Sequence, residues 1–266
     1  MTNNRPLILL TNDDGVFSPG LRALARALCD VGEILIAAPR RQQSSTGHSL
    51  GRVGAICRES IGLDIPGITA YSIEATPAMA ARVGVMLLAQ RPVALAISGI
   101  NYGENVGVNI TTSGTVGAAQ ETASFGIPSI AASVETSPAY HFDPSEAVDF
   151  TVAGDFTRRV AAAILARPLP SGIDIVKVDV PDNATSSTPW QLTRLTRQRY
   201  YESVIQQRED GSVAFDGYRR TSDLSSLEPD SDAYALLVNH AISVCPLTLD
   251  QSASMNGHLT ADWLAF

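Results

Sequence analysis

The sequence LILLTNDDGVFSPG, from Leu7 to Gly20, decides the fold class because it joins a short apolar run to a helix start. Leu7 to Thr11 has the length and apolar character of a buried strand. Ser18-Pro19 supplies an N-cap residue followed by proline at the first helical position. Between these signals stand two adjacent carboxylates, Asp13 and Asp14. A strand, an acidic turn and a helix in this order predict the first βα unit of a parallel sheet.

The same alternation of strand and helix signals continues through the first two-thirds of the chain. The further predicted strands are residues 34–38, 68–73, 93–97, 130–134 and 175–180, and the further predicted helices begin at Thr76-Pro77, Gly114 and Val152. In the helix after Thr76 we expect one apolar face, made of Met79, Val83, Met86 and Leu87. The pattern predicts an α/β protein with a parallel sheet and helices on both faces.

The pattern changes after about residue 185. Residues 190–204 and 213–220 are typical of strands, and the sequence REDGS at 208–212 between them is typical of a turn. We therefore predict an α/β domain at residues 1–185. Residues 186–266 are predicted to form a C-terminal extension with a β-hairpin and a terminal segment.

Composition narrows the class of protein. Of the 266 residues, 45% are hydrophobic and 17% are charged, which is ordinary for a globular protein. The net charge of -8 argues against binding to a nucleic-acid polymer or to an anionic membrane. The three cysteines are scattered and odd in number, so we expect free thiols. No apolar run approaches the roughly 20 residues of a membrane span, and no signal-type segment begins the chain. A cytoplasmic protein is therefore expected.

Four distinctive stretches occupy loops that follow predicted strands or open a predicted helix. They are TNDDG at 11–15, RRQQSSTGHS at 40–49, SGINYGENVGVN at 98–109 and TTSGTV at 111–116. In an open parallel sheet, ligands bind beyond the carboxyl ends of the strands. We therefore expect these loops to meet at one site.

The adjacent carboxylates predict a cation in that site. Neighbouring carboxylates repel, which raises one pKa unless a cation compensates. Mg²⁺ and Mn²⁺ prefer oxygen ligands. Asp13 and Asp14 supply two, while Ser44 or Ser45, together with Asn101, can supply neutral oxygens. The alternative is that the acidic pair is only a polar turn before a helix.

The stretch Thr112-Ser113-Gly114-Thr115 places small residues at a predicted helix start. Backbone N–H groups and hydroxyls in that position can cradle a phosphate, although a plain N-cap is the commoner role for such residues. No GxxxxGK[ST] sequence occurs, which excludes P-loop chemistry.

Four motifs taken together resemble one protein family. LLTNDDGVxxPGL, APxxQxS, SGINxGxNxG and SGTVGAAxE occur in this order between Leu7 and Val134. In this order they resemble the SurE survival-protein family of metal-dependent 5′/3′-nucleotidases and phosphatases. The resemblance implies a Rossmann-like three-layer domain and a C-terminal extension that takes part in forming a homodimer or homotetramer.

The resemblance also implies a site and a substrate. One divalent ion per subunit, Mg²⁺ or Mn²⁺, would be held by four residues: Asp13, Asp14, Ser44 and Asn101. Asn12, Ser113, Gly114 and Thr115 would bind the substrate phosphate. Asn12 would also act in catalysis with Asp13 and Asp14, by stabilising charge on the phosphoryl oxygens. The implied substrates are nucleoside 5′-monophosphates, and 3′-monophosphates in some members.

Several positions depart from the family pattern. They are Arg40, Ser45, Met79, Ala80 and Thr112. None of these departures removes a proposed metal ligand. They lie near the motifs, so they bear on which base and which phosphate position are preferred.

The implied reaction is attack of water on a phosphomonoester, in which the cation polarises a phosphoryl oxygen and Asp13 or Asp14 accepts the water proton. His48 is a candidate general acid, although a surface loop is the commoner setting for such a histidine.

Three other interpretations compete with this reaction. Phosphatases that form an aspartyl-phosphate use carboxylates two residues apart, whereas here the carboxylates are adjacent, and this spacing disfavours that mechanism. A non-catalytic nucleotide- or metal-binding regulator is the alternative from another class, and an assembly protein acting through residues 190–220 is a third.

Overall fold

The computed structural model describes residues 5–63, 65–137, 140, 147–208, 210–220 and 224–252. Its main sheet contains β1 (Leu7–Thr11), β2 (Glu33–Pro39), β3 (Ile56–Glu59), β4 (Ile68–Ile73), β5 (Val93–Tyr102), β6 (Ser129–Val134), β7 (Ile175–Val180), β8 (Trp190–Leu192) and β11 (Ile242–Leu247). The α-helices are α1 (Pro19–Leu28), α2 (Pro77–Val83), α3 (Gly114–Ala123), α4 (Thr151–Ala166) and α5 (Asp232–Leu237). A π-helical turn, η1 (Gly84–Leu88), continues α2, and a 3₁₀ segment, η2 (Gly107–Thr112), precedes α3.

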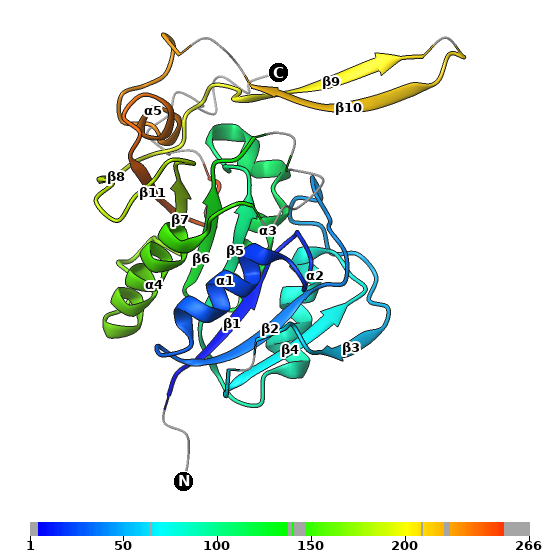
Figure 1. Ribbon diagram of the computed structural model, residues 1–266, viewed down its shortest axis with the longest axis vertical. Coiled ribbons are helices and arrows are strands. Elements are labelled where there is room, and N and C mark those ends of the chain that lie inside the picture. The colour runs from blue at the N-terminus through cyan, green and yellow to red at the C-terminus, as the bar shows by residue number, and fades with distance from the viewer. Residues whose placement is uncertain are drawn as a thin grey trace, which may run out of the picture.

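The order of the strands defines a doubly wound sheet (Figure 1). The nine strands run β3-β4-β2-β1-β5-β6-β7-β11-β8, and those from β4 to β7 are mutually parallel. From β1 the chain moves outward through β2 to β4, and from β5 it moves outward in the other direction to β7. The winding therefore reverses between β1 and β5, which is where ligands bind in such sheets.

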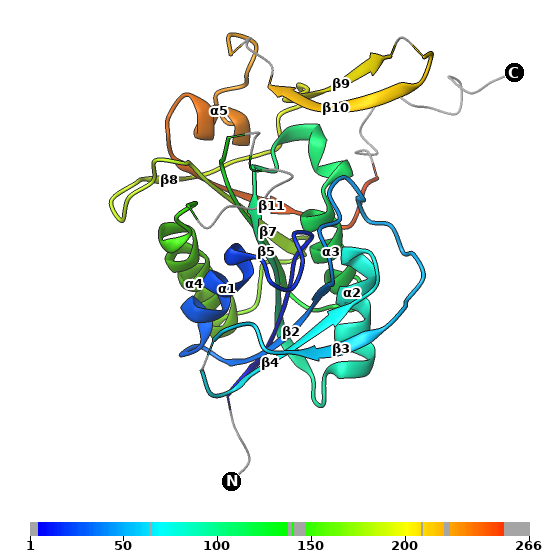
Figure 2. The same cartoon turned by 45° about the vertical axis from the view of Figure 1, so that its right-hand side comes forward.

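Side chains of β1 alternate between the two faces of the sheet, and helices cover both faces (Figures 1 and 2). Ile8 and Leu10 pack in the cluster that contains the apolar residues of α1 and α4, whereas Leu7 and Leu9 pack with residues of α2. Leu10 is fully buried, so its replacement by alanine would cost about 2–5 kcal/mol. The predicted α/β fold, Rossmann-like with three layers, is confirmed.

The face predicted for the helix after Thr76 is wrong in part. Thr76 caps α2 by accepting from the Met79 amide, as expected, and Val83 is buried. Met86 and Leu87, however, are 68% and 63% exposed. The α-helix gives way to a π-helical turn at Gly84, which has more residues per turn, so the following side chains rotate out of register with Val83.

The segment after residue 185 contributes both to the main sheet and to a separate hairpin. The hairpin of β9 (Tyr201–Gln207) and β10 (Val213–Arg220) is antiparallel and turns at 208–212, as predicted. The single strand predicted at 190–204 is wrong, because that range holds β8 and the start of β9, and the chain between them leaves the extended conformation. The Thr196 amide donates to Asp232 at the start of α5 instead of to a strand. The boundary at residue 185 stays a prediction, although β8 and β11 lie in the main sheet.

Two further sequence expectations concern membranes and cysteines. In the described ranges, no helix combines the length and apolar character needed to cross a membrane. Cys29, Cys57 and Cys245 are all free thiols, which confirms that expectation.

Candidate active site

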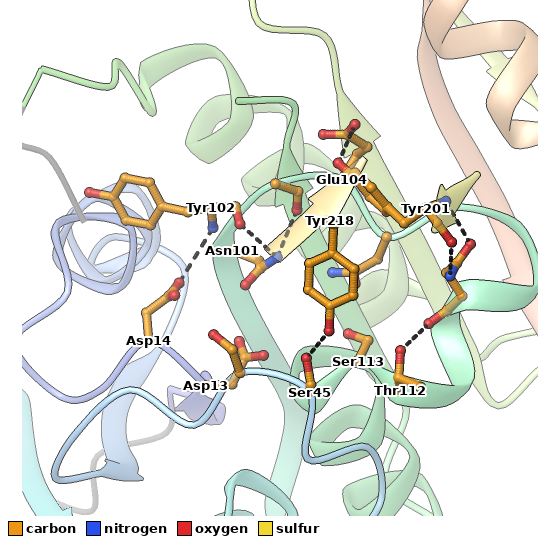
Figure 3. A pocket seen from close by; sticks show the side chains of 14 residues that line it. Asp13, Asp14, Ser45, Asn101, Tyr102, Glu104, Thr112, Ser113, Tyr201 and Tyr218 are labelled. Carbon is orange, nitrogen blue, oxygen red and sulfur yellow. Dashed lines mark hydrogen bonds between the residues drawn. The ribbon is translucent and has the colours of Figure 1, made fainter. Parts of the chain in front are cut away.

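A polar pocket lies at the point where the winding of the sheet reverses (Figure 3). Residues from four separate parts of the chain line it: the turn after β1, the loop after β2, the segment from the end of β5 through η2 to α3, and the hairpin. They are Asp13, Asp14, Ser44, Ser45, Asn101, Tyr102, Gly103, Glu104, Asn105, Asn109, Thr112, Ser113, Tyr201 and Tyr218. All four predicted metal ligands are in this set. The predicted convergence of the loops is therefore seen in the structure.

Asp13 is held by the first turn of α3. Its side chain is buried, and its Oδ1 accepts a hydrogen bond of 2.6 Å from the Thr115 hydroxyl. Gly114 lets the helix come this close, because a Cβ at that position would lie 2.8 Å from the Cβ of Asp13. The helix start that the sequence offered as a phosphate cradle thus orients a carboxylate.

Asp14 is held by weaker contacts from two other elements. Its Oδ1 accepts from Gln42 Nε2 at 3.3 Å, and its Oδ2 accepts from the backbone amide of Tyr102 at 3.4 Å. The side chain is buried like that of Asp13. The acidic pair therefore connects the turn after β1 with the loop after β2 and the end of β5.

Burial dominates the electrostatics of this pair. Burial raises the pKa of Asp13, and the donors Thr115 and Gly114 only partly oppose that rise. Burial raises the pKa of Asp14 well above its usual range, and the neighbouring charge of Asp13 raises it further. Among the described residues, no lysine, arginine or histidine forms an ion pair with either carboxylate. A bound cation would lower both pKa values.

Asn101 completes the arrangement because β5 bulges just before it. The pairing of β5 with β6 shifts in register between Ser98 and Asn101. Gly99 lies within the bulge with a φ of 136°, and a Cβ there would lie 2.3 Å from the carbonyl oxygen of Ala132. Asn101 Nδ2 donates to the carbonyl of Gly103 at 2.7 Å, which turns its own carbonyl oxygen toward Asp13 and Asp14 (Figure 3).

The donor set fits a hard divalent cation. Two carboxylates, an amide carbonyl and the Ser44 hydroxyl are all oxygen ligands, and they line one pocket. The described part of the chain contains no cluster of three His, Cys, Asp or Glu side chains arranged for a metal. A cation at this place would therefore depend on the neutral oxygens as well as on the acidic pair.

Other predicted site residues are placed differently. Asn12 is fully buried, and its side chain both donates to the Gly15 carbonyl at 3.0 Å and accepts from the Gly15 amide at 3.2 Å, so it shapes the turn. It does not line the pocket, nor do Gly114 and Thr115, whereas Ser113 does. The Ser113 hydroxyl caps α3 by accepting from the Val116 amide at 3.1 Å. The phosphate-binding roles of these residues stay predictions.

The hairpin supplies pocket residues that the sequence did not indicate. Tyr201 and Tyr218 line the pocket, and the Tyr218 hydroxyl is hydrogen-bonded to Ser45 (Figure 3). No local motif marks either tyrosine, and both lie more than 80 residues after the last motif loop, at 111–116. Among the departures from the family pattern, only Ser45 and Thr112 line the pocket. Arg40 instead forms an exposed ion pair of 3.1 Å with Glu74.

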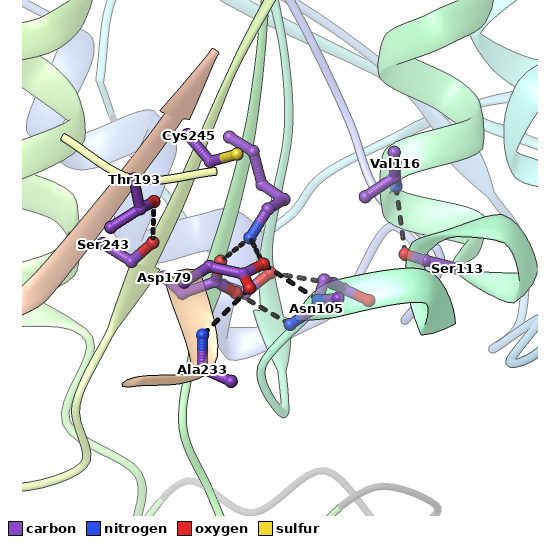
Figure 4. A network of polar contacts seen from close by, with 12 residues as sticks. Asn105, Ser113, Val116, Asp179, Thr193, Ala233, Ser243 and Cys245 are labelled. Atoms are coloured by element: carbon purple, nitrogen blue, oxygen red, sulfur yellow. Dashed lines mark hydrogen bonds and ion pairs between the residues drawn. The ribbon is translucent and has the colours of Figure 1, made fainter. Parts of the chain in front are cut away.

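A second acidic cluster lies beneath the same segment of chain (Figure 4). Lys177, Asp179 and Asp232 are fully buried, and the Lys177 ammonium contacts both carboxylates, at 3.1 Å in the case of Asp232. Asp179 accepts from the Asn105 amide at 2.7 Å, and Asp232 accepts from the Gly107 amide at 2.9 Å. These contacts fix residues 105 and 107 of the segment that lines the pocket, and Lys177 supplies the positive charge of the cluster.

These observations define an α/β protein with an acidic, oxygen-lined pocket at the switch point of a doubly wound sheet. Residues 8–202 match the family model described as "Survival protein SurE", so the chain belongs to the SurE family.

Named relatives are similar over almost the whole chain. A 5′-nucleotidase SurE from Thermococcus gammatolerans is 40% identical over 252 residues, which are 94% of this chain and 92% of the relative. A 5′-nucleotidase SurE from Thermococcus kodakarensis is 38% identical, with 94% and 95% covered. The crystal structure of the SurE protein from Aquifex aeolicus superimposes with a TM-score of 0.75 at 30% identity, covering 93% of this chain and 95% of that one.

Proposed function

We propose that this chain is a metal-dependent phosphatase that hydrolyses nucleoside 5′-monophosphates to nucleoside and phosphate. The observation that carries the proposal is the buried pair Asp13 and Asp14, which has no cationic partner in the described chain and shares its pocket with two neutral oxygen ligands. The relatives named 5′-nucleotidase SurE support the choice of substrate class. The proposal extends to 3′-monophosphates as secondary substrates.

Asp13, Asp14, Ser44 and Asn101 would hold one Mg²⁺ or Mn²⁺ ion. When bound, such an ion polarises a phosphoryl oxygen and makes water more acidic. Asp13 is orientated by Thr115 and is therefore fixed before substrate arrives. The less firmly held Asp14 carboxylate is the better placed of the two to accept a proton from the attacking water.

We assign the remaining lining residues to two roles, the binding of the phosphate and the binding of the nucleoside. Asn109, Thr112 and Ser113 present amide and hydroxyl groups on the η2 and α3 side of the pocket, where they can bind phosphoryl oxygens. Tyr201 and Tyr218 present aromatic rings from the hairpin, and aromatic rings stack on nucleobases without strict preference for one base. Asn12 supports this arrangement indirectly, by fixing the turn that carries the acidic pair.

The proposal includes a homodimer or homotetramer in the cytoplasm. The hairpin projects from the main sheet (Figures 1 and 2), and its Ile205 and Val213 are 66% and 68% exposed. An isolated two-stranded hairpin is only marginally stable in water, so a partner surface would stabilise it. Light scattering on the eluting protein measures the assembly state, and a monomeric mass would contradict this part.

Phosphate release from a panel of 5′- and 3′-nucleoside monophosphates tests the proposed activity. The panel is run with Mn²⁺, with Mg²⁺ and with EDTA. We expect metal-dependent release from 5′-nucleotides that falls at least about 100-fold in Asp13→Asn, because the variant loses a ligand charge. Asp30→Asn is the matched control, since Asp30 only forms an exposed ion pair with Arg158. Cation binding without any release would favour the regulatory alternative.

A further inference from the structure

The loop of residues 44–48 is held by contacts with α3 and with the chain just before it. The loop carries Ser44, a proposed cation ligand, at one end and His48 at the other. Between them, the Gly47 amide donates to the carbonyl of Thr112 at 3.0 Å. The loop is thus fastened to the chain just before α3.

The loop also lies directly on α3. A Cβ at Gly117 would come within 2.4 Å of the Gly47 carbonyl oxygen and 2.7 Å of the His48 amide nitrogen. Real Cβ atoms do not approach backbone that closely, so only glycine allows this packing. The position of the loop therefore depends on the surface of α3.

One turn further along α3, Glu121 joins three elements. Its side chain is 2% exposed, and its two carboxylate oxygens contact different partners. Oε2 lies 2.7 Å from His48 Nε2, and Oε1 accepts from Arg82 Nε of α2 at 2.5 Å. None of these three residues lines the pocket.

A buried carboxylate needs such partners, because an unpaired one is costly to bury. The His48 and Arg82 side chains are each more than one-third exposed, so water could solvate both if Glu121 were absent. What Glu121 adds is a fixed anchor for His48, four residues from the candidate ligand Ser44.

We propose that Glu121 is a positioning residue for the candidate cation site. It holds His48, His48 fixes the loop of residues 44–48, and the loop places Ser44 against the acidic pair. The inference rests on the proposed function. Partners behind metal ligands commonly change metal affinity by about 10- to 100-fold when they are removed.

The test measures Mn²⁺ affinity by calorimetry on the full chain, in the wild type, His48→Ala, Glu121→Ala and the double variant. We expect each single variant to raise the Kd about 10-fold and the double variant to raise it no further, since both remove one connection. His48→Gln should restore most of the affinity, because its amide nitrogen can donate to Glu121. Arg40→Ala is the control, as the Arg40–Glu74 ion pair is exposed and does not reach the loop.

Amide hydrogen exchange of the metal-free proteins supplies a second readout. We expect the Gly47 amide to exchange faster in His48→Ala and Glu121→Ala than in the wild type and in Arg40→Ala, at unchanged melting temperature for His48→Ala. If Glu121→Ala fails to fold, His48→Ala decides, because its side chain is 38% exposed.

The outcomes separate this inference from the proposed function. A wild type that binds Mn²⁺ and releases phosphate, with His48→Ala unchanged in Kd and in exchange, overturns the positioning role alone. A wild type that neither binds Mn²⁺ nor releases phosphate overturns both. Equal losses in the Arg40→Ala control would also overturn the positioning role, because the effect would not be specific to Glu121.

Discussion

Two pairs of buried carboxylates hold the segment of residues 102–107, and they are balanced in opposite ways. Asp14 accepts a hydrogen bond from the backbone amide of Tyr102, and Asp179 accepts one from the backbone amide of Asn105. The pair Asp179 and Asp232 encloses Lys177, the only lysine in the sequence. The pair Asp13 and Asp14 has no ion pair with any described side chain.

The difference separates a cluster whose charges the protein balances itself from one that has no internal cation among the described residues. In the cluster around Lys177, Asp179 and Asp232 raise the pKa of the ammonium group, whereas burial alone would lower it. The ammonium therefore stays charged, and the cluster needs no bound cation. In the pair Asp13 and Asp14, burial raises both pKa values and the charge of Asp13 raises that of Asp14 further, with no protein cation to oppose them. Buried acidic groups therefore mark a ligand site only where the protein does not supply the opposite charge.

The largest effect is expected from Lys177→Met, which removes the internal cation. Two buried carboxylates would be left unpaired, and breaking a buried ion pair in this way costs about 3–5 kcal/mol. Urea unfolding of the metal-free protein measures the change. A loss below about 1 kcal/mol would mean that the cluster is not held by its charge balance.

Thr115→Val tests how Asp13 of the pair Asp13 and Asp14 is orientated. It removes the hydroxyl that donates to Asp13 Oδ1, so Asp13 loses its orientation, and Mn²⁺ should bind about 10-fold more weakly. Thr122→Val is the matched control, because Thr122 is also buried on α3 but donates within the helix and is hydrogen-bonded to Ser129. Equal effects of the two substitutions would contradict a special role for Thr115.

Asp14→Asn should stabilise the metal-free protein, whereas substitutions of buried residues usually lower stability. Without metal, the variant should be more stable than the wild type by at least about 1 kcal/mol at neutral pH, which corresponds to less than one pKa unit. The folded-state pKa of Asp14 is raised above its unfolded value, so its contribution is favourable at low pH and is lost as pH rises through the folded pKa. The variant lacks this titration. Its advantage in melting temperature should therefore grow as the pH rises above the usual range of an aspartate pKa, and should vanish or reverse with saturating Mn²⁺.

The smallest effect is expected from Arg40→Ala. Arg40 departs from the family pattern, but its ion pair with Glu74 joins side chains that are 49% and 50% exposed. Exposed pairs contribute about 0–1 kcal/mol. Stability should change by less than that, and phosphate release should be unaltered. A tenfold loss of release would place Arg40 in substrate binding.

Much of the fold was predictable because its signals are local. The strand at Leu7, the proline after Thr76 and the glycine-rich start of α3 each fix an element through neighbouring residues. The meeting of the loops that carry Asp13, Asp14 and Asn101 with the loop of residues 40–49 followed from the topology of the sheet, whereas the choice of Ser44 over Ser45 followed from the family resemblance.

What could not be predicted depends on contacts between distant residues. The hydrogen bond from the Thr115 hydroxyl to Asp13 has no sequence signal, because it depends on how closely α3 approaches the turn after β1. Tyr201 and Tyr218 come to the pocket because Glu104 accepts from the Tyr200 and Tyr201 hydroxyls and so fastens the base of the hairpin. The π-helical turn that begins at Gly84, after which Met86 is exposed, has no sequence signal of its own.

Calorimetric titration of Mn²⁺ into metal-free wild type, Asp14→Asn and Asp30→Asn tests the central claim most directly. The claim is that the acidic pair without an internal cation is the cation site. We predict one site per chain in the wild type and in Asp30→Asn, and loss of that site in Asp14→Asn while the variant stays folded. Undiminished Mn²⁺ binding by folded Asp14→Asn would contradict the claim, because the cation would then lie elsewhere in the molecule.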